Sequence, residues 1–262
     1  MTFLGSIGGY ALGKAAAVRH VAAVVWAVLG LAVRPSSWSR VVRDVLARQI
    51  LFTGVDAVRF MAMIALLIGV SVVVQVQMWV ARAGQSEILG PLLVIVLMRE
   101  VGPVLVNFIV IGRTGAAIAA EMASMRVGGD IAVLDAQGID PMIYLVMPRV
   151  LGVAVSVFCL SVLFIIISFG SGYLSGLPLG VSPGDPTVFL DSVFGGISRE
   201  DVYNLMAKTL IPGMLTGTIA CLEGMNVEGA VTEIPQAATR AVVRSTGTLF
   251  VVSAIVSILT YA

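Results

Sequence analysis

The feature that most constrains this 262-residue sequence is a series of apolar runs, each long enough to cross a lipid bilayer as a helix. The apolar core of a bilayer is about 30 Å thick and needs about 20 residues of α-helix. Only 12% of the residues are charged and 58% are hydrophobic, whereas soluble domains carry about 25% charged residues. The sequence therefore predicts an all-α integral membrane protein with about five transmembrane helices. These are expected at about 56–80, 89–120, 143–176, 202–222 and 243–261.

Residues 1–53 differ from the rest because charged residues interrupt their apolar stretches. Over 40–50, arginines alternate with aliphatic residues at helical spacing, which is typical of a helix lying in the membrane interface. We expect one or two such helices, followed by a transmembrane bundle over 54–262, with the whole of 1–262 forming a single domain. The alternative is that 15–33 itself spans the membrane. No removable signal peptide is predicted, because the N-terminus lacks a basic region followed directly by an apolar core.

Lysine and arginine residues gather on one side of the predicted topology. They are concentrated in 1–53 and in the connections 121–149 and 223–244, and they are sparse in the other two connections. Because basic loops stay in the cytoplasm, we expect a cytoplasmic N-terminus and a C-terminus on the opposite side. Aromatic residues at the predicted outer ends agree with this orientation: Trp79, Tyr173, Tyr203 and Tyr261.

Several common site types are disfavoured by the sequence. A net charge of +1 gives no electrostatic case for nucleic acid, and His20 is the only histidine, which disfavours a metal site. The Gly8-x4-Gly13-Lys14 motif matches most of a P-loop, but Ala15 follows it where Ser or Thr should bind Mg²⁺. We therefore expect no nucleotide, cofactor or metal bound by this chain.

Charged residues within the second run are the strongest pointer to function. Arg99 and Glu100 lie about ten residues into the run, roughly 15 Å deep, where a charge costs at least about 2.5–3.5 kcal/mol. Adjacent helical residues point in different directions, so each of the two needs its own partner or water. Lys208 in the fourth run lies at a similar depth, which predicts a Glu100–Lys208 contact. Pro103, after Gly102, is expected to free a backbone carbonyl and bend the helix.

Two interpretations of this charged level stay open. The three charges and the Gly-Pro pair favour a polar lining of a central pathway, with Arg99, Glu100 and Lys208 facing the substrate. The alternative is a charge pair that only locks two helices together. Lower in the second run, Arg113 and Glu121 lie on roughly one side of the helix, where an interhelical or headgroup contact is expected.

The segment 121–141 is short and amphipathic, and it ends at Asp140-Pro141 because a residue before proline avoids the helical region. It is typical of a cytoplasmic helix against which an ATPase could push, although an ordinary surface loop would look similar. Small residues also recur at helical spacing in two GxxxG pairs, Gly172/Gly176 and Gly213/Gly217. These pairs predict close helix packing, either within the chain or at a subunit interface.

The second run and the connection after it resemble the MlaE/YrbE family of ABC-transporter permeases. The resemblance covers the chain from about residue 40 to the end, including the tail 238–250. Its motifs are Arg99-Glu100-x-Gly102-Pro103, Gly112-Arg113-x-Gly115, Ala120-Glu121, Met125-Arg126, Asp140-Pro141 and Pro148-Arg149.

The resemblance implies a non-enzymatic permease that dimerises in the bacterial inner membrane and binds two cytoplasmic ATPases, which carry the ATP and Mg²⁺. The family moves phospholipid or related lipid between that membrane and an MCE-type carrier. It implies an interfacial helix plus five spans, with Arg99, Glu100 and Lys208 lining a lipid cavity at the dimer centre. The coupling helix would include Met125, Arg126, Asp130 and Asp135.

The chain departs from the family at Gly128-Gly129, where relatives often carry Glu. Each glycine should loosen the start of the coupling helix by roughly 1 kcal/mol, and Asp130 is the candidate replacement carboxylate.

Other functions remain open from the residues alone. A secondary transporter could use Glu100 as a proton relay, although no internal repeat is evident. A non-transporting scaffold is a further alternative, and a membrane enzyme is disfavoured because His20 has no triad partners.

Overall fold

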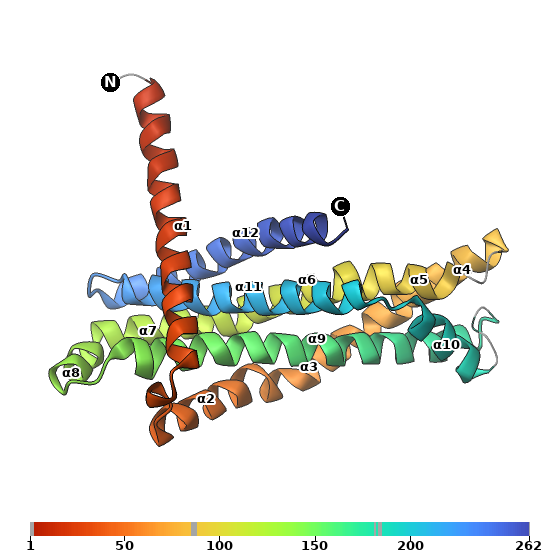
Figure 1. The fold of residues 1–262 in the computed structure, drawn as a ribbon, viewed down its shortest axis with the longest axis horizontal. Coiled ribbons are helices and arrows are strands. Elements are labelled where there is room, and N and C mark those ends of the chain that lie inside the picture. Colours follow the sequence, from red (N-terminus) through yellow and green to blue (C-terminus); the bar gives the residue numbers. More distant parts are fainter. Residues whose placement is uncertain (1–2, 85–87, 181, 183–184, 262) are drawn as a thin grey trace.

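The computed structural model is a bundle of long helices that run side by side, with the N-terminal helix crossing them (Figure 1). It describes the backbone of residues 3–84, 88–180, 182 and 185–261, and the side chains of these residues except 3–15, 17, 36 and 83. The predicted loop residues at 85–87 and 183–184 lie outside the described residues. No strand occurs in the described part of the chain, which confirms the all-α class.

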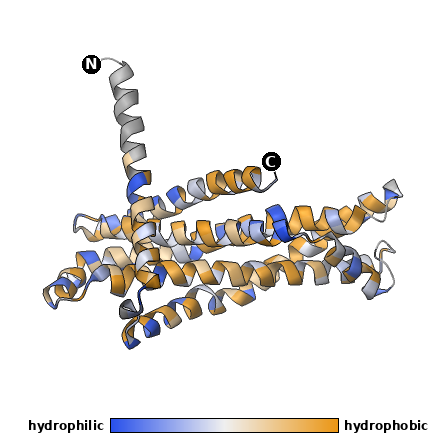
Figure 2. Ribbon diagram, in the orientation of Figure 1, coloured by the Kyte–Doolittle hydropathy of each residue, from blue (hydrophilic) through white to orange (hydrophobic). Residues whose placement is uncertain are grey.

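Five helices within the described ranges are long and apolar enough to cross a membrane, as the sequence predicted. Figure 2 shows hydrophobic residues along the length of these helices. The five are Arg40–Arg82, Leu89–Val127, Met142–Gly176, Arg199–Met225 and Val231–Tyr261.

Four of these helices are built from shorter elements, and the fourth along the chain is a single α-helix. The first holds α2 (Arg40–Thr53), η2 (Val55–Ala57), α3 (Val58–Ile68), η3 (Gly69–Val73) and α4 (Val74–Ala83). The second holds α5 (Leu89–Leu93), η5 (Val94–Val101), α6 (Gly102–Val110), η6 (Ile111–Gly115) and α7 (Ala116–Val127). The third holds η7 (Met142–Val146) and α9 (Met147–Gly176), the fourth α11 (Arg199–Met225), and the fifth η8 (Val231–Glu233) and α12 (Ile234–Tyr261). Outside them lie α1 (Phe3–Val33), η1 (Pro35–Ser37), α8 (Asp130–Ala136) and α10 (Pro186–Gly196).

Helix α1 runs across the direction of the long helices, near the end of the bundle that carries α8 (Figure 1). Its residues Val24 and Val28 are buried in the main core. The indole N–H of Trp38 donates a 2.8 Å hydrogen bond to the carbonyl of Ala32, which fixes the turn after the helix. The P-loop-like stretch 8–14 lies inside this continuous helix, so it forms no loop around a phosphate.

The first long helix begins earlier than predicted, at Arg40 rather than near residue 56. The amphipathic stretch α2 packs on α9 instead of ending before the bundle. A Cβ atom at Gly152 would lie 2.6 Å from Cγ of Gln49, and the Gln49 amide donates to Oγ1 of Thr53 at 2.8 Å. The absence of a side chain at Gly152 lets the polar part of α2 approach α9.

Helix α9 lies at the centre of the bundle and contacts α2, α3, α6 and α11. A Cβ atom at Gly213 would lie 2.9 Å from Cα of Ala154, and one at Gly217 would lie 2.9 Å from Cα of Val150. The Gly213/Gly217 pair therefore brings the backbones of α11 and α9 together within one chain, which confirms the intramolecular alternative for this pair.

Two polar connections contain more helix than predicted. The expected loop at 177–200 holds α10, whose N-cap Asp185 accepts hydrogen bonds from the hydroxyl and the backbone N–H of Thr187. Both bonds lower the pKa of the Asp185 carboxyl, and the bond from the Thr187 hydroxyl contributes more than that from the backbone N–H. The expected polar turn at 223–240 is shorter than predicted, because α12 already begins at Ile234. Arg240 and Arg244 therefore lie within a helix.

Candidate functional site

Pro103 rearranges the backbone around the charged level of the second span. Proline has no N–H, so it cannot donate to the carbonyl of Arg99 four residues earlier. The chain just before it, η5, is a π-helix, a geometry that is frequent at functional sites. The freed carbonyl of Arg99 instead accepts a 2.8 Å hydrogen bond from Nζ of Lys208 on α11. The predicted release of a carbonyl by Pro103 is thus confirmed, and Lys208 is what uses it.

The predicted contact between Glu100 and Lys208 is also confirmed. Nζ of Lys208 lies 2.8 Å from Oε1 of Glu100, and the same oxygen accepts a 2.9 Å hydrogen bond from the Ser257 hydroxyl on α12. The Lys208 side chain is fully buried, whereas that of Glu100 is 52% exposed. The ion pair therefore presents a carboxylate, with the ammonium group behind it.

Arg99 has a separate partner that sequence reasoning missed. Its Nε lies 2.6 Å from Oδ1 of Asp201, which has a fully buried side chain in the first turn of α11. The guanidinium also lies 4.4 Å from the ring centre of Tyr261. Asp201 is three residues after Ser198, which is the spacing of a capping box. This spacing could have placed Asp201 at the start of a helix, but it could not have identified Arg99 as its partner.

A continuous set of polar contacts holds Asp201 in place. Its Oδ2 accepts hydrogen bonds from the backbone N–H and the hydroxyl of Ser198, at 2.8 and 2.9 Å. Its Oδ1 accepts a 2.9 Å hydrogen bond from the hydroxyl of Tyr261, which in turn accepts one from the Asn204 amide. The amide of Asn107 ties α6 to α11 nearby, donating to the carbonyls of Pro103 and Lys208.

Next to this cluster, a groove of about 480 Å³ lies between the second span and α12. Glu100 and Ser253 supply its polar groups. The remaining wall is apolar and includes Val104 and Leu105 of α6 and Phe250 of α12. A groove with a charged group and an apolar wall matches the two chemical halves of an amphipathic molecule. Its lining residues are Glu100, Val101, Val104, Leu105, Phe250, Ser253 and Ala254.

Further ion pairs lie toward the α8 end of the bundle. Nη2 of the buried Arg149 lies 2.8 Å from Oε1 of Glu121, which joins α9 to α7. Arg113 donates a 3.3 Å hydrogen bond to the carbonyl of Phe52 and lies 5.4 Å from the centre of its ring. The expected interhelical contacts of Arg113 and Glu121 are thus both present, with different partners.

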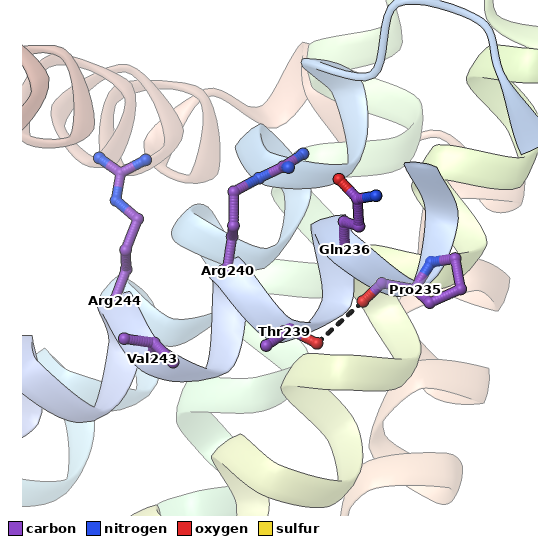
Figure 3. A pocket seen from close by; sticks show the side chains of 6 residues that line it. All are labelled: Pro235, Gln236, Thr239, Arg240, Val243 and Arg244. Carbon is purple, nitrogen blue, oxygen red and sulfur yellow. Dashed lines mark hydrogen bonds between the residues drawn. The ribbon is translucent and has the colours of Figure 1, made fainter. Parts of the chain in front are cut away.

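A second charged cluster that sequence reasoning missed joins α11 to α12. Glu223 is buried and pairs with Arg240, at 3.3 Å, and with Arg244. The two arginines project from one side of α12 (Figure 3) and line an open pocket of about 500 Å³. The spacing of four residues could have predicted that Arg240 and Arg244 lie on one side of a helix. It could not have predicted that Glu223 lies opposite them.

The segment between the second and third spans forms the short helix that the sequence predicted. Gly128 ends α7, and Gly129 adopts a left-handed conformation with φ of 80° before α8. The two glycines therefore make the turn between helices rather than weakening a helix interior. Ile131 is buried and anchors α8, while the charged residues of the segment are exposed: Arg126, Asp130 and Asp135.

The remaining motif residues have structural positions. Asp140 accepts a 2.8 Å hydrogen bond from the N–H of Met142, which starts the third span after Pro141. Met125 packs against the main core, and Pro148 lies buried in the first turn of α9. A Cβ atom at Gly102 would lie 2.6 Å from the carbonyl of Leu97, one at Gly115 would touch Thr216, and one at Gly112 would meet open space.

Five membrane-spanning helices joined by ion pairs that each have one buried partner, with an amphipathic groove beside them, define a multi-pass membrane permease. The chain belongs to the MlaE permease family: the family model described as Permease MlaE matches residues 46–259. Among the described residues, no cluster of three or more His, Cys, Asp or Glu side chains could hold a metal ion.

Curated relatives agree with this class. A probable ABC transporter permease protein of Rickettsia prowazekii (strain Madrid E) is 33% identical over 203 residues, which is 77% of each chain. A second, from Synechocystis sp. (strain ATCC 27184 / PCC 6803 / Kazusa), is 30% identical over 184 residues, 70% of this chain and 69% of the relative. The chloroplastic protein TRIGALACTOSYLDIACYLGLYCEROL 1 of Arabidopsis thaliana is 28% identical over 191 residues, 72% of this chain and 54% of the relative.

Proposed function

We propose that this chain is the permease subunit of an ABC transporter that moves phospholipid or a related lipid between the inner membrane and an MCE-type carrier. The observation that carries the proposal is the groove that Glu100 lines. Its polar groups on Glu100 and Ser253 suit the polar end of a lipid, and its wall of Val104, Leu105 and Phe250 suits an acyl chain. The name of the Arabidopsis relative includes that of a diacylglycerol lipid, which agrees with this cargo.

The ATPase would bind at α8. The exposed charges of Arg126, Asp130 and Asp135 surround a helix that is anchored to the bundle through Ile131, so a push on α8 would be transmitted to the spans. ATP and Mg²⁺ would be bound by the ATPase subunit and not by this chain. In this arrangement the α8 end is cytoplasmic, and α10 and the C-terminus lie on the opposite, periplasmic side.

A second copy of the chain would pack against α12. In the apolar 18-residue stretch of this span, only 22% is buried within the chain, against 33–61% for the corresponding stretches of the other four spans. Its exposed side chains include Phe250, Val251 and Ile255. Pairing α12 with the same helix of a second permease would enclose the groove at the centre of a dimer. The MCE-type carrier would then meet the periplasmic end of that groove.

The test is purification of the tagged chain in mild detergent from the cells that produce it naturally, followed by lipid mass spectrometry and an ATPase assay. We expect a stoichiometric ATPase, an MCE-type protein and bound phospholipid, and transport in proteoliposomes that needs ATP. Transport that follows a proton gradient and ignores ATP would instead favour a carrier that uses Glu100. Recovery of partner proteins with no lipid and no transport would favour a scaffold.

A further inference from the structure

The charged level of the spans has balanced charges. Arg99 is paired with Asp201, and Lys208 is paired with Glu100. These two cations and two carboxylates sum to zero. A phosphate group that entered the groove would therefore meet no uncompensated positive charge, and among the described residues that line the groove the one charged group is the carboxylate of Glu100. Binding an anionic headgroup requires one of the two pairs to open.

The two pairs differ in how firmly their carboxylates are held. Asp201 is fully buried and accepts hydrogen bonds from Ser198 and Tyr261 in addition to its contact with Arg99. Glu100 is 52% exposed, and both of its hydrogen bonds end on one oxygen, Oε1. Glu100 also lines the groove. The pair that can open is thus Glu100–Lys208, by rotation of the Glu100 side chain into the groove.

The buried cation stays in position when Glu100 leaves. Nζ of Lys208 also donates to the carbonyl that Pro103 frees on Arg99, so a second bond holds it in its buried place behind Glu100. A phosphate oxygen that took the place of the carboxylate would receive a charge-assisted hydrogen bond from Lys208. The remaining lipid would extend along Val104, Leu105 and Phe250.

We propose that Glu100 is an internal counterion that competes with the phosphate of a lipid headgroup for Lys208. This inference rests on the proposed lipid function and specifies how its site is regulated. Because only the open pair can bind, the apparent affinity for the lipid equals the affinity of the open site multiplied by the fraction of time that the pair is open. It suits a transporter, because return of Glu100 to Lys208 expels the headgroup and prevents the site from holding its cargo.

Glu100→Gln tests the proposal because the amide keeps an oxygen for both Lys208 and Ser257 while removing the charge. Binding of phosphatidylglycerol to the purified transporter complex would be measured by native mass spectrometry, with inorganic phosphate as a second probe. If the open pair is populated at about a tenth or less, Glu100→Gln should tighten lipid binding about tenfold or more. The double variant Glu100→Gln with Lys208→Met should lose that gain. Glu200→Gln, at an exposed acid on α11, is the matched control.

The outcomes separate the inference from the function on which it rests. Wild-type protein that binds phosphatidylglycerol while Glu100→Gln binds it equally or more weakly overturns the counterion role and leaves the lipid function standing. Absence of lipid binding by both proteins overturns the two together. Displacement of the lipid by equimolar inorganic phosphate would assign the site to free phosphate and overturn the lipid assignment. Thermal unfolding of each variant, compared with that of Glu200→Gln, shows whether it is folded.

Discussion

The hydroxyl of Tyr261 donates a 2.9 Å hydrogen bond to Asp201, 60 residues earlier in the chain, and so joins the last described turn of α12 to the first turn of α11. Asp201 also pairs with Arg99 of η5. Three segments that are distant in sequence therefore meet at one buried carboxylate. Because α12 is otherwise the least buried of the five spans, this contact and that of Ser257 with Glu100 hold its C-terminal half beside the groove.

Removing the Tyr261 hydroxyl should loosen the end of α12. Tyr261→Phe keeps the ring over Arg99 but loses the hydrogen bonds to Asp201 and Asn204. A hydrogen bond of this kind contributes about 0.5–1.5 kcal/mol, so amide exchange near residues 255–261 should accelerate about two- to tenfold. Tyr203→Phe, at an exposed tyrosine of α11, is the control. Unchanged protection in α12 would show that the hydroxyl does not hold the helix.

Asp201 should matter more for stability than the exposed acid beside it. Asp201→Ala leaves the partly buried Arg99 without its counter-charge and removes the capping box of α11. The expected loss in the free energy of unfolding is about 3 kcal/mol, measured by thermal or denaturant unfolding in detergent. Glu200→Ala should change it by less than about 0.5 kcal/mol. Equal effects of the two substitutions would contradict the role given to Asp201.

Close packing of α11 on α9 should be sensitive to a single methyl group. In Gly213→Ala the new Cβ would lie 2.9 Å from Cα of Ala154, a backbone atom that cannot rotate away. Replacing glycine by alanine in a helix gains about 1 kcal/mol in helix propensity. Overpacking against atoms that cannot shift costs about 1–3 kcal/mol, so the net effect at Gly213 should be destabilising. We expect a lower melting temperature. Gly170→Ala, where no heavy atom lies within 4 Å, should be neutral or stabilising.

The surface of α8 should bind the ATPase without contributing to the fold. Asp130 and Asp135 are exposed, so Asp130→Lys with Asp135→Lys should leave the melting temperature nearly unchanged. Co-purification of the ATPase should fall at least severalfold, because reversing two charges on a contact surface disrupts its electrostatic match to a partner. Asp191→Lys, at an exposed acid of α10 on the opposite end, should leave it unchanged. An ATPase that still binds the double variant would place the coupling contact elsewhere.

Much of the fold and part of the site follow from the sequence because they depend on distance along a helix. A rise of about 1.5 Å per residue places Glu100 and Lys208 at one depth, and their contact is present. The missing N–H of Pro103 likewise requires that the Arg99 carbonyl find another donor. The amphipathic pattern after Glu121 predicted a short helix there, and α8 forms it.

The partners of Arg99 and of the two arginines of α12 do not follow from such counting. Depth leaves open the rotation of each helix about its axis and the choice of neighbouring helices. Those are decided by packing, as when Gly213 lets α11 approach α9. The number of spans, the depth of their charges and the freed carbonyl follow from the order of residues, because these are properties of single helices. Helix packing is what brings Asp201 and Tyr261 to Arg99, and Glu223 to Arg240 and Arg244. Packing also places Glu100 rather than Lys208 in the lining of the groove.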